Sequence, residues 1–112
     1  MSLGKKLAVT GANGFVGRAL CLEAVNRGFV VRGITRSHCI LPPGVENIAV
    51  GNVDGNTLWS DALVDCDVII HLAARVHIMH DKSRDPLAEF RTVNTAGTIR
   101  LAQCAVASGV RR

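Results

Sequence analysis

The stretch TGANGFVG, residues 10–17, places three glycines between a short apolar run and an amphipathic one. The run before it, Lys6 to Thr10 (KLAVT), has the composition of a strand that is buried on both faces of a parallel sheet. Apolar residues then recur at steps of three and four from Gly14 to Arg27, at Phe15, Ala19, Leu22 and Val25. This spacing predicts a helix, so the glycines lie at a strand-to-helix junction.

The position of the glycines predicts a loop that holds a diphosphate. Gly11 permits a tight turn, Gly14 lets a phosphate approach the backbone, and Gly17 lets the helix pack close to the strand. The amides of the first helical turn, together with the helix dipole, favour an anion there. The alternative is that the glycines only serve a tight turn, and the strand-to-helix context favours the phosphate loop. The remaining loop residues assigned to this site are Asn13, Phe15 and Val16.

Strand-like and helix-like segments alternate along the rest of the chain. The expected elements are strands at Phe29–Thr35, Asn47–Val50 and Asp67–Leu72, a short helix at Asn56–Leu63, and a long helix at Pro86–Ser108 with Asp85 as its N-cap. Such alternation implies parallel pairing through right-handed crossovers. The sequence therefore predicts an α/β fold, a Rossmann-type doubly wound parallel sheet.

Three motifs occur in a fixed order. The first is T-G-x-x-G-x-x-G at residues 10–17, the second is His71-Leu72-Ala73-Ala74, and the third is Val93-Asn94-Thr95-Ala96-Gly97-Thr98. With these motifs the sequence resembles the extended short-chain dehydrogenase/reductase family, the NAD(P)-dependent nucleotide-sugar epimerases, dehydratases and reductases of the UDP-glucose 4-epimerase type. Residues 71–80 (HLAARVHIMH) and 86–91 (PLAEFR) are most similar to members that make bacterial surface-polysaccharide sugars.

The end of the second expected strand bears on the choice between NAD and NADP. A carboxylate at this position normally binds the adenosine ribose and repels the 2′-phosphate of NADP. Here the position is Thr35, followed by Arg36 and Ser37. An arginine can clamp a 2′-phosphate or stack on adenine, so the sequence favours NADP over NAD. A surface arginine that merely ends a strand is the alternative, and many relatives hold NAD.

The resemblance implies further cofactor contacts. Asn52 stands where the family usually has an Asp that reads the adenine amino group, and its carbonyl can still accept that hydrogen bond. Val53 is expected to pack on the adenine. The H-L-A-A motif implies that Leu72, Ala73 and Ala74 line the path to the nicotinamide ribose, with Arg75 just beyond. Asn94 is expected to brace the active-site strand.

The residues that the family uses for chemistry are absent. The resemblance implies a Tyr that takes a proton from a sugar hydroxyl, a Lys four residues later, and a Ser or Thr that orients the substrate. The chain contains no Tyr, so no catalytic residue is assigned and the 112 residues alone are expected to be inactive. For the full-length parent the leading hypothesis is UDP-sugar C4 epimerisation or dehydration. An NADPH-dependent 4-keto-sugar reductase of surface-polysaccharide synthesis and a non-catalytic dinucleotide-sensing module are the alternatives.

Composition excludes several other classes of protein. The net charge of +4 comes from scattered Lys and Arg, so nucleic-acid binding is not expected. No apolar run is long enough to span a membrane. The four cysteines are widely spaced, which indicates free thiols in a reducing cytoplasm. His77 and His80 are three residues apart with Asp81 beside them, a spacing that can serve a metal on a helix, but no further ligand converges, so solvated histidines are expected and no metal site is assigned.

Residues 1–112 are expected to form one domain, the N-terminal NAD(P)-binding portion of a longer protein. After Gly109, Val110 to Arg112 has the pattern of the start of a fifth strand, so we expect the sheet to be truncated after the fourth strand and the following helix. The fifth strand and a C-terminal substrate domain would then lie outside this chain. Relatives commonly pair through the helix equivalent to 86–108 and its successor, which makes a homodimer an expectation for the parent only.

Overall fold

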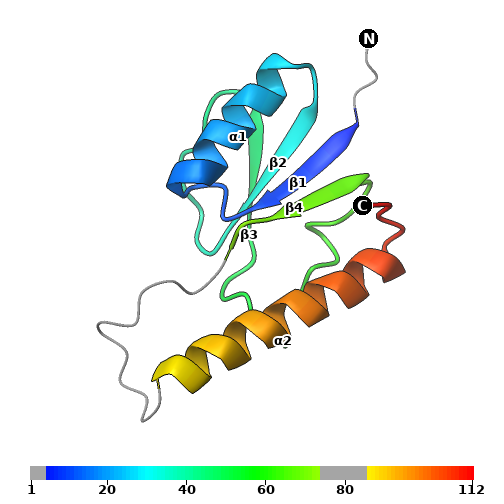
Figure 1. Ribbon diagram of the computed structural model, residues 1–112. Helices are drawn as coiled ribbons and strands as arrows, with labels where there is room; N and C mark the ends of the chain where they lie inside the picture. Colours follow the sequence, from blue (N-terminus) through cyan, green and yellow to red (C-terminus); the bar gives the residue numbers. More distant parts are fainter. Residues whose placement is uncertain (1–4, 74–85) are drawn as a thin grey trace.

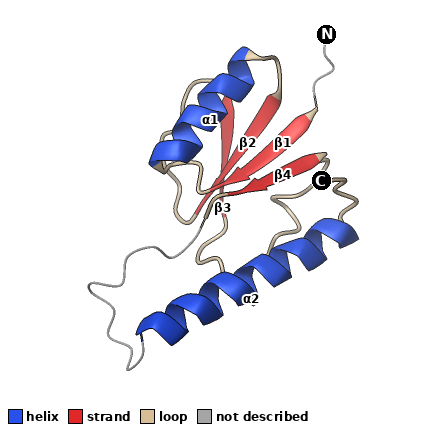
Figure 2. Ribbon diagram, in the orientation of Figure 1, coloured by secondary structure: helices blue, strands red, loops and turns tan. Residues whose placement is uncertain are grey.

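The chain folds into a parallel sheet with a helix on each face (Figure 1). The computed structural model describes residues 5–73 and 86–112, with only the helical backbone described for residues 86–93. The elements are β1 (Lys6–Thr10), α1 (Phe15–Asn26), β2 (Val30–Thr35), β3 (Val45–Ala49), β4 (Val68–His71) and α2 (Pro86–Ala107). The strand order is β3-β2-β1-β4, and every pairing is parallel (Figure 2). The predicted Rossmann-type α/β fold is confirmed.

The strand register brings three carboxyl ends to one edge of the sheet. Thr10, the last residue of β1, is paired with Ile34 of β2 and with His71 of β4. The chain leaves β1 towards β2 on one side and returns on the other side as β4. Strand order therefore reverses at β1, and in open α/β sheets ligands bind beyond the carboxyl ends of the strands at such a point.

The core consists of two apolar layers, one on each face of the sheet. α1 and α2 cover opposite faces (Figure 1). The layer under α1 contains Leu7, Val9, Ala12, Cys21, Ala24 and Val31. The layer towards α2 contains Ala8, Ile34, Trp59, Ala62, Leu63, Cys66 and Leu101. Neighbouring residues of β1 thus point to opposite faces, as in any strand buried on both sides.

The helix predicted over Asn56–Leu63 is wrong. This stretch is a series of turns, and Asp65 adopts a left-handed conformation with φ of 58°. One reason is the carbonyl of Thr57, which accepts a hydrogen bond from Nε of Arg100 in α2 at 3.2 Å, where a helix would pair it with the amide of Asp61. Arg32 of β2 is 5% exposed and holds the end of the segment by donating Nη1 to the carbonyls of Ala62 and Val64 at 2.7 and 2.8 Å.

α2 confirms the long predicted helix and packs closely on the segment that follows β3. A Cβ at Gly97 would lie 3.1 Å from Cγ1 of Val53 and 3.2 Å from its carbonyl oxygen. Arg100 Nε donates to the carbonyl of Thr57 at 3.2 Å. The glycine of the third motif therefore sets the distance between α2 and residues 52–57.

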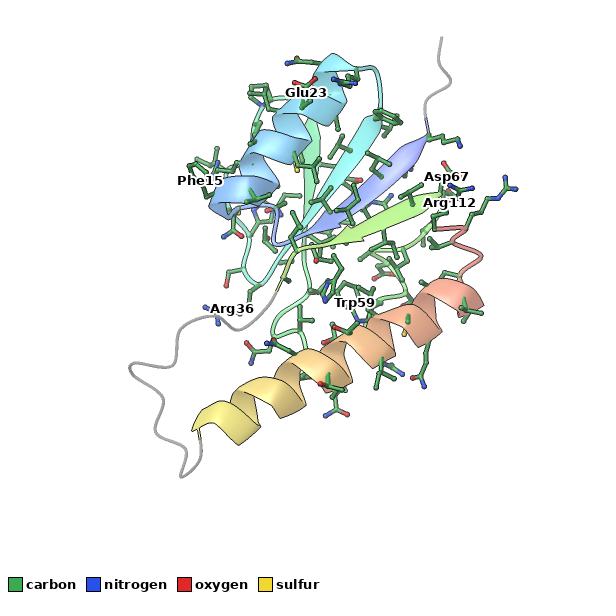
Figure 3. The ribbon with its side chains drawn as sticks, in the orientation of Figure 1. Phe15, Glu23, Arg36, Trp59, Asp67 and Arg112 are labelled. Carbon is green, nitrogen blue, oxygen red and sulfur yellow. The ribbon has the colours of Figure 1, made fainter. Side chains whose placement is uncertain are left out.

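The last residues lie beside the start of β4. The amide of Ile69 donates to the carbonyl of Arg112 at 2.7 Å, and the amide of Arg111 donates to the carbonyl of Asp67 at 3.0 Å. Asp67 and Arg112 are accordingly close together in Figure 3. The amide of Val110 donates to the carbonyl of Ala105 at the end of α2, so among the last three residues only Arg111 and Arg112 form backbone hydrogen bonds with residues 67–69, and the fifth strand stays a prediction.

Candidate functional site

The glycine loop joins β1 to α1 at the point where strand order reverses. Gly11 has φ of +66°, and its carbonyl accepts a hydrogen bond from the amide of Gly14 at 3.0 Å. A Cβ at Gly11 would lie 3.0 Å from the amide nitrogen of Ala73. Both the turn and the approach of the chain after β4 therefore require glycine here, as the sequence predicts.

The other two glycines differ in what surrounds them. A Cβ at Gly17 would lie 2.1 Å from the carbonyl oxygen of Gly11, so glycine is what allows α1 to pack against the end of β1. A Cβ at Gly14 would meet only that same oxygen, at 3.4 Å, and its φ of −78° suits any residue. The described parts of the protein therefore need glycine at 11 and 17, whereas a methyl group at 14 would make only an ordinary contact.

The N-terminus of α1 is left open for an anion. Gly14 is the N-cap and provides no side-chain hydrogen bond, and the first turn carries no acidic residue. Phe15 is 95% exposed and points away from the sheet (Figure 3), and Asn13 and Val16 are exposed as well. The first amides of a helix lack intrahelical partners. An anionic group placed here would meet those amides and the positive end of the helix dipole.

A fully buried hydroxyl joins β1 to the chain after β4. Thr10 Oγ1 accepts hydrogen bonds from the amides of Leu72 and Ala73 at 2.9 and 3.0 Å, and it lies 2.7 Å from Nδ1 of His71. A hydroxyl has one proton and two lone pairs, so the proton goes to Nδ1. His71 is then the neutral tautomer with its proton on Nε2, and burial lowers the pKa of His71 in the same direction.

The side chains of Thr35 and Asn47 form hydrogen bonds with the backbone of the loop after β2. Thr35 is 3% exposed and donates its hydroxyl to the carbonyl of Ser37 at 2.8 Å. Asn47 of β3 donates Nδ2 to Thr35 Oγ1 at 2.9 Å and accepts from the amide of Cys39 at 2.8 Å. The side chain of Thr35 therefore faces the protein, whereas Arg36 is exposed at the edge of the sheet (Figure 3).

Arg18 connects this loop to the glycine loop. It lies in the first turn of α1 and donates Nε to the carbonyl of Asn13 at 3.2 Å and Nη2 to the carbonyl of Ile40 at 3.0 Å. The side chain is exposed. The two loops at the mouth of the site thus share one guanidinium.

Comparison with known proteins agrees with this geometry. The sequence model of the NAD dependent epimerase/dehydratase family matches residues 7–112. The chain belongs to this family. It is 37% identical over 109 residues to a UDP-glucose 4-epimerase of Vibrio cholerae, covering 96% of this chain and 33% of the relative. It is 33% identical over 111 residues to a 3 beta-hydroxysteroid dehydrogenase/Delta 5-->4-isomerase of Mycobacterium tuberculosis, covering 96% of this chain and 30% of the relative.

Solved structures of the family have the same fold. The structure of MoeE5 in complex with UDP-glucuronic acid and NAD superposes with a TM-score of 0.73 at 29% identity, covering 94% of this chain and 34% of MoeE5. The chain therefore spans about a third of the length of the relatives that it matches. In the described part of the chain no helix is long and apolar enough to cross a membrane. All four cysteines are free thiols.

The remaining residues assigned from the sequence lie after β4, after β3 and on α2. Leu72 and Ala73 follow β4 beside Gly11, while Ala74 and Arg75 lie outside the described residues, as do His77, His80 and Asp81. Asn52 is exposed after β3, and Val53 is half-buried against Gly97. Asn94 is half-buried on α2.

Sequence reasoning missed the roles of Thr10, Arg18 and Asn47. A signal was present for Arg18, because a cation in the first helical turn opposes the dipole and no carboxylate stands three or four residues from it. For Thr10 the signal was its position at the end of a buried strand, because a buried hydroxyl needs hydrogen-bond partners. Asn47 gave no local signal, since its partners come from β2 and the following loop.

Proposed function

We propose that residues 1–112 are the dinucleotide-binding portion of a cytoplasmic NAD(P)-dependent enzyme. The observation that carries the proposal is Gly14. The fold requires glycine at 11 and 17, but the described protein atoms leave space beside Gly14, next to a helix N-terminus without a cap. A diphosphate that contacts the amides of residues 14–17 fits this arrangement, and a side chain at 14 would obstruct it. The NAD in the MoeE5 structure supports the same assignment.

We infer that NADP is preferred to NAD. Thr35 offers no carboxylate to the adenosine ribose, and its hydroxyl is bonded to Ser37 and Asn47. Arg36 is exposed at the same edge and carries no opposing charge beside it in the loop. A guanidinium there favours the dianionic 2′-phosphate through charge-assisted hydrogen bonds. Ser37 adds a short polar side chain to the same loop.

Fluorescence titration with NADPH and NADH tests both parts of this proposal. We expect NADPH to bind more tightly than NADH. The substitution Arg36→Leu should lower the affinity for NADPH by about tenfold and change the affinity for NADH by no more than about twofold. Equal affinities in the unmodified protein would remove the preference for NADP. If neither dinucleotide binds, the binding function itself is wrong.

For the reaction of the whole protein we propose C4 oxidoreduction of a UDP-sugar. The similarity to the Vibrio cholerae epimerase and the UDP-glucuronic acid in the MoeE5 structure support this substrate class. The role of this chain is to bind the dinucleotide and orient it. Asn52 and Val53 would contact the adenine, Leu72, Ala73, Ala74 and Arg75 would lie along the nicotinamide ribose, and Asn94 would brace the neighbouring strand. A bound dinucleotide would supply the hydride acceptor.

One alternative is favoured by a specific residue. Arg36 and the inferred preference for NADP fit a reductase that consumes NADPH, and a 4-keto-sugar would be its substrate. Assay of the product of the complete reading frame separates the three hypotheses. Interconversion of UDP-glucose and UDP-galactose indicates an epimerase, and NADPH consumption with a UDP-4-keto-sugar indicates a reductase. A frame without a Ser and a Tyr-x-x-x-Lys would indicate a dinucleotide-sensing module.

Pairing of the parent through α2 is the remaining part of the proposal. Ile99 and Val106 on this helix are 53% and 79% exposed, which supports an apolar contact with a second copy. Sedimentation of the product of the complete reading frame tests it. We expect a dimer that Val106→Asp weakens, and a monomer at micromolar concentration would contradict the pairing.

A further inference from the structure

Arg18 has no role in the binding proposal above, yet it contacts both loops of the site. Its Nε donates to the carbonyl of Asn13 in the glycine loop, and its Nη2 donates to the carbonyl of Ile40 in the loop after β2. These carbonyls are far apart in the sequence. A planar guanidinium with five N–H groups in a fixed fork can hold two such acceptors at once.

The contact with Ile40 completes the support of the loop formed by residues 36–40. Thr35 holds the carbonyl of Ser37, Asn47 holds the amide of Cys39, and Arg18 holds the carbonyl of Ile40. Three side chains from three different elements therefore fix the backbone directly after Arg36. Such support reduces the conformational freedom that Arg36 would lose on binding a ligand.

Arg18 and Arg36 both place a positive charge at the edge of the sheet where the glycine loop and the loop after β2 lie. Residues 10–22 and 35–45 contain both arginines and no Asp or Glu. Both side chains are exposed, and the contacts of Arg18 leave its Nη1 group outside those two hydrogen bonds. The positive potential at this edge of the sheet is therefore not neutralised by a nearby carboxylate in either loop.

We propose that Arg18 is a positioning residue for recognition of the 2′-phosphate: by holding Ile40 to the glycine loop it presets Arg36. The inference rests on the proposed dinucleotide-binding function and deepens it. Arg18 acts through the position of the loop, so its effect on the ratio of the two affinities depends on the presence of Arg36. Loss of Arg18 therefore lowers the affinity for NADPH more than the affinity for NADH.

A double-mutant cycle on the dissociation constants of NADPH and NADH tests the proposal. The variants are Arg18→Met, Arg36→Met and the double variant, with thermal unfolding of each as the check on folding. We expect Arg18→Met to lower the ratio of Kd for NADH to Kd for NADPH by about fivefold or more, because residues that are coupled through a shared backbone segment interact to roughly this degree. In the Arg36→Met background the same substitution should leave the ratio unchanged.

Two further variants separate the bridge from its charge and from general effects. Arg18→Lys keeps the charge but lacks the planar guanidinium. We expect its ratio of Kd for NADH to Kd for NADPH to lie between the ratios of Arg18→Met and the unmodified protein. Arg27→Met removes an exposed arginine from the far end of the same helix, where it pairs with Glu23, and should leave the ratio unchanged.

The outcomes that overturn the inference are distinct from failure of the binding function. If Arg18→Met lowered the affinities for NADH and NADPH equally, Arg18 would have a structural role only. A drop of the ratio that persists in the Arg36→Met background, or full recovery by Arg18→Lys, would mean that its charge acts alone. Absence of binding of either dinucleotide to the unmodified protein would instead refute the proposed function.

Discussion

The glycine loop and the segment between β3 and β4 are both connections at the margin of the sheet, and they differ in which polar groups the protein itself satisfies. In the glycine loop, the amide of Gly14 donates to the carbonyl of Gly11 and Arg18 donates to the carbonyl of Asn13, but no side chain caps the amides of the helix that follows. In residues 52–66, Thr57 binds the carbonyl of Asn52, and Arg32 binds the carbonyls of Ala62 and Val64.

The difference separates a connection whose carbonyls are bound within the protein from one whose helical amides stay available for the proposed dinucleotide. Buried polar groups without partners are costly, so residues 54–66 bind their carbonyls to nearby donors. A helix N-terminus whose amides are left open keeps its hydrogen-bonding capacity for another molecule. The experiments below alter one connection at a time.

The largest effect is expected for Arg32→Met. The substitution removes the buried donor that holds the turns between β3 and β4, and it leaves the carbonyls of Ala62 and Val64 without that partner. We expect the free energy of unfolding to fall by about 2–4 kcal/mol, because two carbonyls lose a charged donor and each such loss costs about 1–3 kcal/mol. Urea denaturation followed by circular dichroism measures it.

The matched control is Arg27→Met, which removes an exposed arginine that forms an ion pair with the exposed Glu23. We expect a change of less than about 1 kcal/mol for this surface pair. Equal losses for the two variants would show that Arg32 does not anchor the segment.

Gly17→Ala should have the next largest effect. The added methyl would lie 2.1 Å from the carbonyl oxygen of Gly11 and 2.8 Å from Cα of Ala12, so backbone must move. We expect a loss of about 1–3 kcal/mol in the same denaturation experiment, the cost of overpacking. In Gly55→Ala, within residues 52–66, the methyl would make an ordinary contact with Ala96 at 3.5 Å. If Gly55→Ala cost as much as Gly17→Ala, close packing at 17 would not be the cause.

The smallest effect is a dependence of stability on pH through His71. Burial lowers its pKa below the ordinary value of 6.5, and the hydrogen bond from Thr10 also favours the neutral ring. Above pH 6.5 both the folded and unfolded forms are neutral, so His71 contributes no pH dependence. Below it the unfolded chain takes up the proton more readily, and the free energy of unfolding falls until the folded pKa is passed.

His71→Asn provides the comparison, since its amide oxygen can accept the hydrogen bond from Thr10 without titrating. We expect the unmodified protein to lose more stability than this variant between pH 7 and pH 5 in paired urea denaturation series. The idea fails if the two pH profiles run parallel.

The sequence predicted those features that depend on neighbouring residues. All four strands, α1 and α2 were found from apolar spacing and glycine position, and the structural roles of Gly11 and Gly17 are confirmed by their contacts. The helix over 56–63 was wrong because the carbonyl of Thr57 accepts a hydrogen bond from Arg100, which lies 43 residues later on α2. Local pattern cannot reveal a partner of that kind.

The same limit applies within the candidate site. Thr35 was assigned to the cofactor from its place in the sequence, but the orientation of its hydroxyl depends on Asn47 of β3. The bridge made by Arg18 depends on a loop 22 residues later. The residues proposed to bind the dinucleotide form a sequence motif, whereas the partners of Thr35 and Arg18 are found only once the strands are side by side.

The most direct test of the account is the affinity of Gly14→Ala for NADPH and NADH, measured beside its free energy of unfolding. The described protein has space for this methyl, so we predict stability within about 1 kcal/mol of the unmodified protein, with both dinucleotides bound at least about tenfold more weakly. Unchanged affinities in a stably folded Gly14→Ala protein would contradict the claim that the open glycine loop holds the diphosphate.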